Sequence, residues 1–234
     1  MEKLDLREKG GNQQYSERRL FMQLLAFGNC TIVPGLRRAL LASEMEGVLY
    51  EDVNDPNGVG LLTWSEDPAF FVTTLREFLQ APPFNELTFK PEYTMLGHTY
   101  GIGFEPDLKD VLLDKPRRSV TEAAHPWAVW YPLRRAGAFA ALDPKDRGAI
   151  LSEHGAIGHA FGTAGYAQDI RLACTGLDRN DNDFVIGLVG EKLHPLAACV
   201  QAMRKTRQTA NFISQMGPFF VGRAVWRAMK TGKL

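Results

Sequence analysis

The sequence has little cysteine, no excess of charge and no long apolar run. Its three cysteines, Cys30, Cys174 and Cys199, are too scattered for a disulfide framework, and no CxxC pair suggests zinc. The 27 basic residues balance the 27 acidic ones, so no broad surface for nucleic acid or anionic lipid is expected. No apolar run approaches the roughly 20 residues that cross a bilayer, and residues 1–14 lack the apolar core of a secretory signal. We therefore expect a cytoplasmic protein without membrane or nucleic-acid partners.

The 234 residues are 45% hydrophobic, which is typical of one large globular domain or two small joined ones. Residues 1–16 carry polar residues and glycines without periodicity and predict a mobile N-terminal tail. Apolar runs, capping residues and turn residues then predict the regular elements. The strands are expected at 19–27, 47–53, 58–64, 86–93, 127–133, 169–174, 184–189 and 218–222, and the helices at 35–46, 67–79, 144–161 and 195–208.

These elements follow the order β-α-β-β-α-β twice, which is the order of a ferredoxin-like unit. The first half is expected at 17–115 and the second at 116–234. Each half has one sheet face covered by helices, so the other face needs a partner. The fold class we predict is α+β, with the two ferredoxin-like halves packed sheet on sheet as one α+β barrel.

One of the five histidines, His154, lies on a predicted apolar helix stripe. The members of the stripe are Ile150, His154, Ile157 and Phe161. A histidine in this setting is most often a core residue with one hydrogen bond. However, Gly155 and Gly158 lie beside it, and a glycine inside a helix costs about 1 kcal/mol relative to alanine. The glycines leave room for a flat group such as a porphyrin bound through the imidazole, and helix packing is the alternative explanation.

A series of short motifs surrounds this histidine. In order they are Trp130-Tyr131-Pro132-Leu133-Arg134-Arg135, Glu153-His154-Gly155-Ala156-Ile157-Gly158, Thr175-Gly176-Leu177-Asp178, Asp183-Phe184, Met203-Arg204 and Gly217-Pro218-Phe219-Phe220-Val221-Gly222. This series resembles the chlorite dismutase family, which includes the coproheme decarboxylases and belongs to the dimeric α+β barrel superfamily. The resemblance implies an oxidoreductase with heme b or iron coproporphyrin in its second half. It also implies a ring-shaped homo-oligomer, for which we expect a pentamer.

The resemblance assigns roles to individual residues. His154 matches the family's iron ligand, and Tyr131 matches the tyrosine that coproheme decarboxylases oxidise to a radical. Arg135 stands where those enzymes carry a lysine near a propionate. Arg117 and Thr209 occupy positions that resemble other propionate contacts.

The sequence does not identify the residue that faces the open side of the iron. Chlorite dismutases place an arginine there, and many decarboxylases place a glutamine. Counting back from Gly176 gives Asp169 at this place, whereas counting forward from His154 gives Ala167. Arg171 lies two residues beyond Asp169, hence on the same face of the strand, and could serve as the distal cation if the strand register differs.

Three functions remain open. The leading hypothesis is peroxide-dependent decarboxylation of iron coproporphyrin, in which arginines hold the propionates and Tyr131 supplies an electron. The second is a chlorite dismutase that converts chlorite to chloride and dioxygen at heme b, with Arg171 as the cation. The third is a heme-binding protein without turnover, or a barrel with no porphyrin.

Overall fold

The computed structural model describes residues 4–229. Residues 1–3 of the expected tail and residues 230–234 of the expected second half lie outside this range. The first part of the chain forms β1 (Glu8–Lys9), β2 (Tyr15–Ser16), β3 (Phe21–Gly28), α1 (Val33–Ala42), β4 (Gly47–Asp52), β5 (Val59–Ser65), η1 (Pro68–Val72), α2 (Thr74–Leu79), η2 (Phe84–Glu86), β6 (Thr88–His98), η3 (Asp110–Asp114) and α3 (Lys115–Thr121). The second part forms β7 (Trp127–Arg135), η4 (Gly137–Phe139), α4 (Pro144–Thr163), β8 (Gln168–Ala173), β9 (Phe184–Gly190), α5 (Leu193–Arg204), α6 (Arg207–Phe212), β10 (Ile213–Met216) and β11 (Phe220–Ala228).

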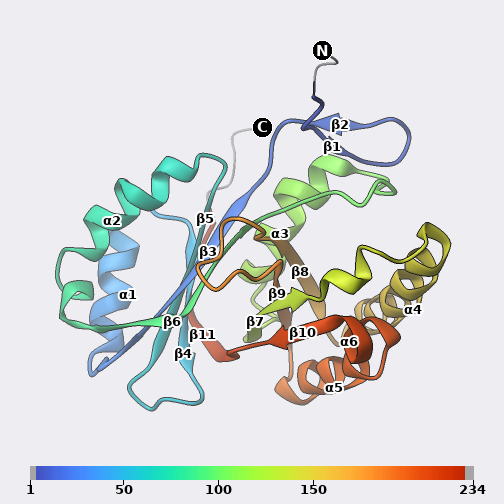
Figure 1. Cartoon of the computed structure of the whole chain (residues 1–234). Coiled ribbons are helices and arrows are strands. Elements are labelled where there is room, and N and C mark those ends of the chain that lie inside the picture. Colours follow the sequence, from blue (N-terminus) through green and yellow to red (C-terminus); the bar gives the residue numbers. More distant parts are fainter. Residues whose placement is uncertain (1–3, 230–234) are drawn as a thin grey trace.

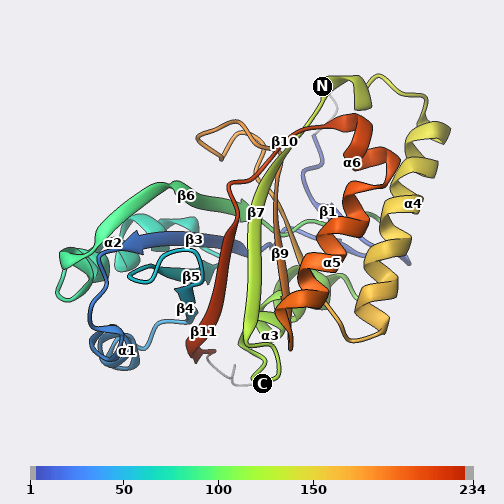
Figure 2. The same cartoon turned by 90° about the horizontal axis from the view of Figure 1, so that it is seen from below.

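The main sheet closes on itself. Within the first part the strands pair in the order β4-β5-β3-β6, and within the second part in the order β11-β7-β9-β8. The two parts are joined where β4 pairs with β11 and where β6 pairs with β8, and every pairing is antiparallel. Strand β10 adds to β7. Helices α1 and α2 lie on one outer side, and α4, α5 and α6 lie on the other (Figure 1 and Figure 2). The predicted α+β class is confirmed, whereas the exact boundary between the halves stays a prediction.

The closed sheet separates three hydrophobic cores. Its interior is filled from both parts of the chain, with Trp130 and Phe220 fully buried. A second core lies between the sheet and helices α1 and α2. The third lies between β7, β9 and helix α5, and it contains Tyr131, Leu196 and Cys199. Alternate residues of β7 therefore face the interior and the outer helices, and Tyr131 faces the helices.

The interior core requires a glycine at position 187. A Cβ at Gly187 would lie 2.5 Å from the indole of Trp130, which is fully buried and cannot move aside. We expect Gly187→Ala to lower the free energy of unfolding by about 1–3 kcal/mol through overpacking. The control is Gly137→Ala, where an added Cβ meets nothing within 4 Å and the expected change is below about 1 kcal/mol. Urea denaturation measures both, and equal effects would contradict this packing.

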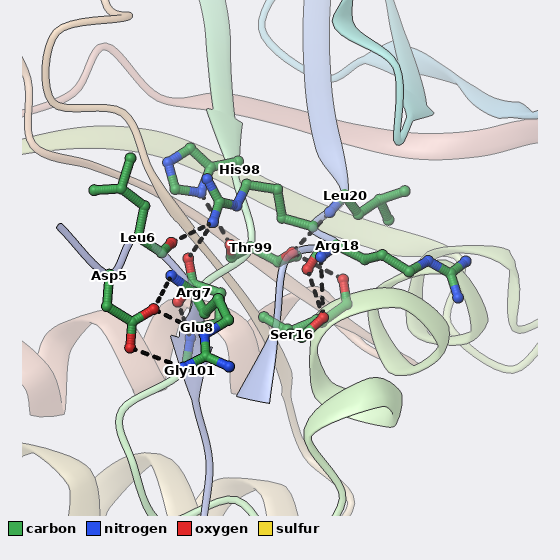
Figure 3. Close-up of polar contacts among 12 residues, drawn as sticks. Asp5, Leu6, Arg7, Glu8, Ser16, Arg18, Leu20, His98, Thr99 and Gly101 are labelled. Atoms are coloured by element: carbon green, nitrogen blue, oxygen red, sulfur yellow. Dashed lines mark hydrogen bonds and ion pairs between the residues drawn. The ribbon is translucent and has the colours of Figure 1, made fainter. Parts of the chain in front are cut away.

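The part of the expected N-terminal tail that the structure describes forms regular contacts, and its mobility stays a prediction. Strands β1 and β2 pair, and the turn between them is bound to a distant loop, since the Gly11 N–H donates to the carbonyl of Glu105 at 2.9 Å. The Gly101 N–H likewise donates to the carboxylate of Glu8 at 3.0 Å (Figure 3). Gly101 and Glu8 are 93 positions apart, so no local pattern reveals this contact.

The predicted helix at 195–208 is wrong in its C-terminal boundary. Helix α5 stops at Arg204, and α6 begins at Arg207 after the extended residue Thr206, whose hydroxyl accepts the Thr209 N–H. The predicted helix at 67–79 is similarly broken into η1 and α2 at Thr73. The last strand, expected at 218–222, runs over Phe220–Ala228. Among residues 4–229, no helix is long and apolar enough to cross a membrane.

Candidate functional site

Helix α4 presents His154 to the junction of α5 and α6. The helix begins as predicted, because the Asp143 side chain accepts the Lys145 N–H at 2.8 Å. His154 is half-buried, and its Nδ1 lies 3.1 Å from the hydroxyl oxygen of Thr206. The adjacent Glu153 accepts hydrogen bonds from the backbone and side chain of Arg207, which ties α4 to α6. These bonds fix the helix that carries the imidazole.

The hydrogen bonds of Thr206 indicate which ring nitrogen of His154 carries the proton. The Thr206 hydroxyl donates to the carbonyl of Met203 at 2.8 Å, and a hydroxyl has only one proton to donate. With that proton directed to Met203, the hydroxyl is an acceptor toward His154, which favours the neutral ring with Nδ1 protonated and the Nε2 lone pair free. Within residues 4–229, no side chain or backbone group forms a hydrogen bond with Nε2. A neutral ring with a free Nε2 is the form of histidine that binds a metal.

The surroundings of His154 keep its ring neutral. Burial lowers the pKa of His154 below its ordinary value, and the positive charges of Arg135 and Arg171 lower it further. Both arginines come from the sheet, one from β7 and the other from β8. The structure thus brings together three residues that the sequence analysis selected.

Tyr131 lies on the face of β7 that is turned toward the outer helices. It is 4% exposed, and its ring stacks on Phe219 with the ring centres 4.6 Å apart. Burial raises the pKa of Tyr131 above its ordinary value, so the phenol keeps its proton at neutral pH. The charges of Arg204 and Asp169 also act on this phenol.

Asp169 and Arg171 form an ion pair on β8. They alternate with Ile170 and Leu172, whose side chains lie in the interior core, so both face outward as their spacing predicted. The Arg171 Nε lies 3.2 Å from Asp169 Oδ2, and each side chain is about 40% exposed (40% and 41%). The cation expected on this face is therefore paired with a carboxylate.

The strand register connects this ion pair to the phenol. Arg171 is opposite Ile186 of β9, and Ile186 is opposite Tyr131 of β7. The cation and the phenol thus lie in one row across the sheet, with one strand between them. Adjacent strands are about 4.8 Å apart, so their backbones are separated by about 10 Å.

Arg135, at the end of β7, is a half-buried cation whose guanidinium forms no ion pair with the part of the chain that the structure describes. Its guanidinium lies 4.4 Å from the ring centre of Phe139 and 4.7 Å from that of Phe184. Its Nε is buried without a hydrogen-bond partner, and no ion pair of the guanidinium is found within residues 4–229, although the Asp183 carboxylate accepts the Arg135 backbone N–H at 2.7 Å. Burial lowers the pKa of Arg135, although a guanidinium remains charged at neutral pH. Such a group is suited to binding the carboxylate of a ligand.

The two glycines beside His154 have different surroundings. A Cβ at Gly158 would lie 3.3 Å from the Met203 methyl group, so this glycine permits close packing of α4 against α5. At Gly155 a Cβ would meet nothing within 4 Å, and the residue is exposed. Helix packing, the alternative explanation, thus accounts for Gly158.

The other two predicted ligand contacts differ in position. The Thr209 hydroxyl lies 3.4 Å from that of Thr206 and is therefore close to His154. Arg117 lies on α3, where its guanidinium is 3.7 Å from the carboxylate of Glu66. No described contact connects Arg117 to His154, so we leave Arg117 out of the candidate site.

Two residues of this region were not predicted from the sequence. Tyr100, in the loop after β6, packs against Phe184 with the ring centres 5.9 Å apart. Burial raises the pKa of Tyr100, and the charges of Arg171 and Arg135 act on it in the opposite direction. No local motif marks this tyrosine. The second is Thr206, which was not selected because it falls inside the predicted helix over 195–208.

Comparison with known proteins identifies the family. The sequence model described as chlorite dismutase matches residues 90–225, which is more than half of the chain. The protein belongs to the chlorite dismutase family. No curated protein sequence matches the chain.

Solved structures agree with the fold. A mutant chlorite dismutase from Candidatus Nitrospira defluvii in complex with cyanide superposes with a TM-score of 0.67 at 16% identity, covering 89% of this chain and 92% of that one. A heme-binding protein from Thermus thermophilus superposes with a TM-score of 0.67 at 17% identity, covering 88% of this chain and 91% of that one. At these low sequence identities, the structural similarity shows a shared fold.

Proposed function

We propose that the protein is a heme-dependent oxidoreductase that uses hydrogen peroxide to decarboxylate iron coproporphyrin. The observation that carries the proposal is His154, with Nδ1 bound to Thr206 and Nε2 free, in a region that also contains Tyr131 and the unpaired Arg135. Family membership and the heme-binding protein of the same fold support it. We retain the homo-oligomeric ring as a prediction that sedimentation analysis tests.

The residues of the site fit an iron porphyrin. A neutral imidazole is a common axial ligand of heme iron, and its second nitrogen is usually held by a hydrogen bond, here to Thr206. Among the described residues the Arg135 guanidinium forms no ion pair and its Nε has no hydrogen-bond partner, so its charge is available to a propionate. Apolar side chains around Tyr131, including Ile186 and Met203, suit the faces of a macrocycle.

The chemistry divides between the cofactor and the chain. When a porphyrin is bound, its iron would supply the centre that reacts with peroxide. Each propionate that becomes a vinyl group releases carbon dioxide, a proton and two electrons, and one hydrogen peroxide accepts the electrons and is reduced to water. In this proposal Tyr131 gives up its phenolic hydrogen and its radical takes a hydrogen atom from the propionate, while Arg135 holds that carboxylate in place.

The Asp169–Arg171 pair favours peroxide over chlorite. Chlorite chemistry requires a cation that retains an anionic product. Here the guanidinium of Arg171 is compensated by a carboxylate 3.2 Å away. The compensated pair has no net positive charge with which to retain an anion, whereas hydrogen peroxide is neutral and does not require one.

We expect the unmodified protein with bound porphyrin to consume peroxide and to release little oxygen from chlorite. Asp169→Asn removes the compensating charge, so it should increase oxygen release from chlorite by at least about tenfold, which corresponds to about 1.4 kcal/mol. An oxygen electrode and a peroxide assay measure both reactions.

Two other results would replace the proposal. Rapid oxygen release by the unmodified protein, abolished in Arg171→Ala, would favour a chlorite dismutase with Arg171 as its cation. Porphyrin binding without consumption of either oxidant would favour a heme-binding protein without turnover.

The experiment that tests the proposed function is an anaerobic titration with heme b and with iron coproporphyrin, followed by peroxide. Mass spectrometry of the porphyrin should then show stepwise loss of carbon dioxide from iron coproporphyrin. An unchanged porphyrin in the presence of consumed peroxide would contradict decarboxylation.

A further inference from the structure

The junction between α5 and α6 contains a threonine whose hydroxyl faces the candidate iron ligand. Thr206 is 2% exposed, and its backbone is extended (φ −71°, ψ 151°) between the two helices. Its hydroxyl oxygen lies 3.1 Å from Nδ1 of His154 but 3.4 Å from the N–H of Thr209, which it caps. The contact with the histidine is thus shorter than the contact that caps the helix.

The hydrogen-bonding capacity of this hydroxyl is fully used. A threonine hydroxyl donates one hydrogen bond and accepts two. The donor is directed to the Met203 carbonyl at 2.8 Å, which is much shorter than the 3.4 Å contact with the Thr209 hydroxyl. The two acceptor positions receive the His154 Nδ1–H and the Thr209 N–H. With its proton directed to the Met203 carbonyl, the Thr206 hydroxyl has none to donate to Nδ1.

We infer that Thr206 is a positioning residue that fixes the Nδ1–H tautomer of His154 and directs its Nε2 lone pair to the porphyrin iron. The role toward iron rests on the proposed function, whereas the tautomer is a property of the protein alone. A hydroxyl is a neutral acceptor, so it orients the imidazole without giving it the anionic character that a carboxylate partner would. The ligand supplied to the iron is therefore a neutral imidazole.

The first test uses the protein without porphyrin. Labelling the histidines with ¹⁵N allows NMR to distinguish a protonated ring nitrogen from a bare one. We expect a signal pair with Nδ1 protonated and Nε2 bare, assigned to His154 by its loss in His154→Ala. Thr206→Val keeps the branched shape but removes the hydroxyl, so both tautomers should appear. Thr206→Ser restores the hydroxyl and should restore the single tautomer.

The second test measures porphyrin affinity. Loss of the group that orients a metal-binding histidine typically costs 10–100-fold in affinity, and we expect about this loss for iron coproporphyrin in Thr206→Val. Thr206→Ser should stay within about threefold of the unmodified protein. The matched control is Thr163→Val on the same helix as His154, because the Thr163 hydroxyl lies 3.5 Å from Nε2 of the exposed His159. This variant should change neither the His154 tautomer nor the affinity.

The outcomes separate the two proposals. An Nε2–H tautomer in the unmodified protein would overturn the inference even if Thr206→Val did not fold. A single Nδ1–H tautomer that persists in a folded Thr206→Val would overturn it as well. If the tautomer depends on Thr206 but the unmodified protein takes up no porphyrin, the proposed function fails, and with it the role of Thr206 toward iron.

Discussion

Replacing Tyr131 with phenylalanine should abolish the decarboxylation of iron coproporphyrin and leave its binding intact. Phenylalanine keeps the ring that stacks on Phe219 and removes only the hydroxyl, so the sheet face stays packed. If the phenol supplies the hydrogen that starts each step, its loss should slow decarboxylation by at least about 100-fold, or about 2.7 kcal/mol in the barrier. Mass spectrometry of the porphyrin after a fixed number of peroxide additions measures the effect.

Two other tyrosines serve as controls for this substitution. Tyr166→Phe changes a residue that is 56% exposed and should leave the rate unaffected. Tyr100→Phe is more demanding, because Tyr100 is half-buried and the charges of Arg171 and Arg135 act on it. Normal decarboxylation by Tyr131→Phe combined with a large loss in Tyr100→Phe would transfer the radical role to Tyr100.

His154→Ala should remove high-affinity binding of the iron porphyrin. The substitution deletes the only nitrogen we assign to the iron, and the remaining contacts are a propionate ion pair and apolar packing. We expect the dissociation constant to rise by at least about 100-fold, which corresponds to about 2.7 kcal/mol. Absorbance titration of the Soret band measures it, and added imidazole should restore the bands by filling the space left by the side chain.

A second histidine on the same helix provides the control. His159 is exposed and its ring lies 3.5 Å from the Thr163 hydroxyl, so His159→Ala should bind porphyrin like the unmodified protein. Equal losses in the two variants would indicate that the substitutions damage the helix and not an iron bond.

The parts of this site that follow local rules could be predicted from the sequence. The stripe of α4 and the cap at Asp143 set the position of His154, and the two-residue period of a strand placed Asp169 and Arg171 on one face. Their ion pair then follows from opposite charges at that spacing. The same rules predicted most strands to within a few residues.

The parts that depend on distant contacts could not be predicted. The two halves of the sheet are joined at β6 and β8 by a single paired position, His98 opposite Ala173, which leaves no pattern in either segment. Tyr100 reaches the site on a loop that the N-terminal hairpin holds. Thr206 interrupts a run of residues with good helix propensity, and it does so because its hydroxyl is engaged by neighbouring backbone and by His154.

The central claim is that Nε2 of His154 binds the iron of a porphyrin, and a crystal structure of the complex with iron coproporphyrin tests it most directly. We predict a bond from Nε2 to the iron, Nδ1 still bound to Thr206, and a propionate beside Arg135. Iron bound through another side chain, or a porphyrin located away from helix α4, would contradict the account.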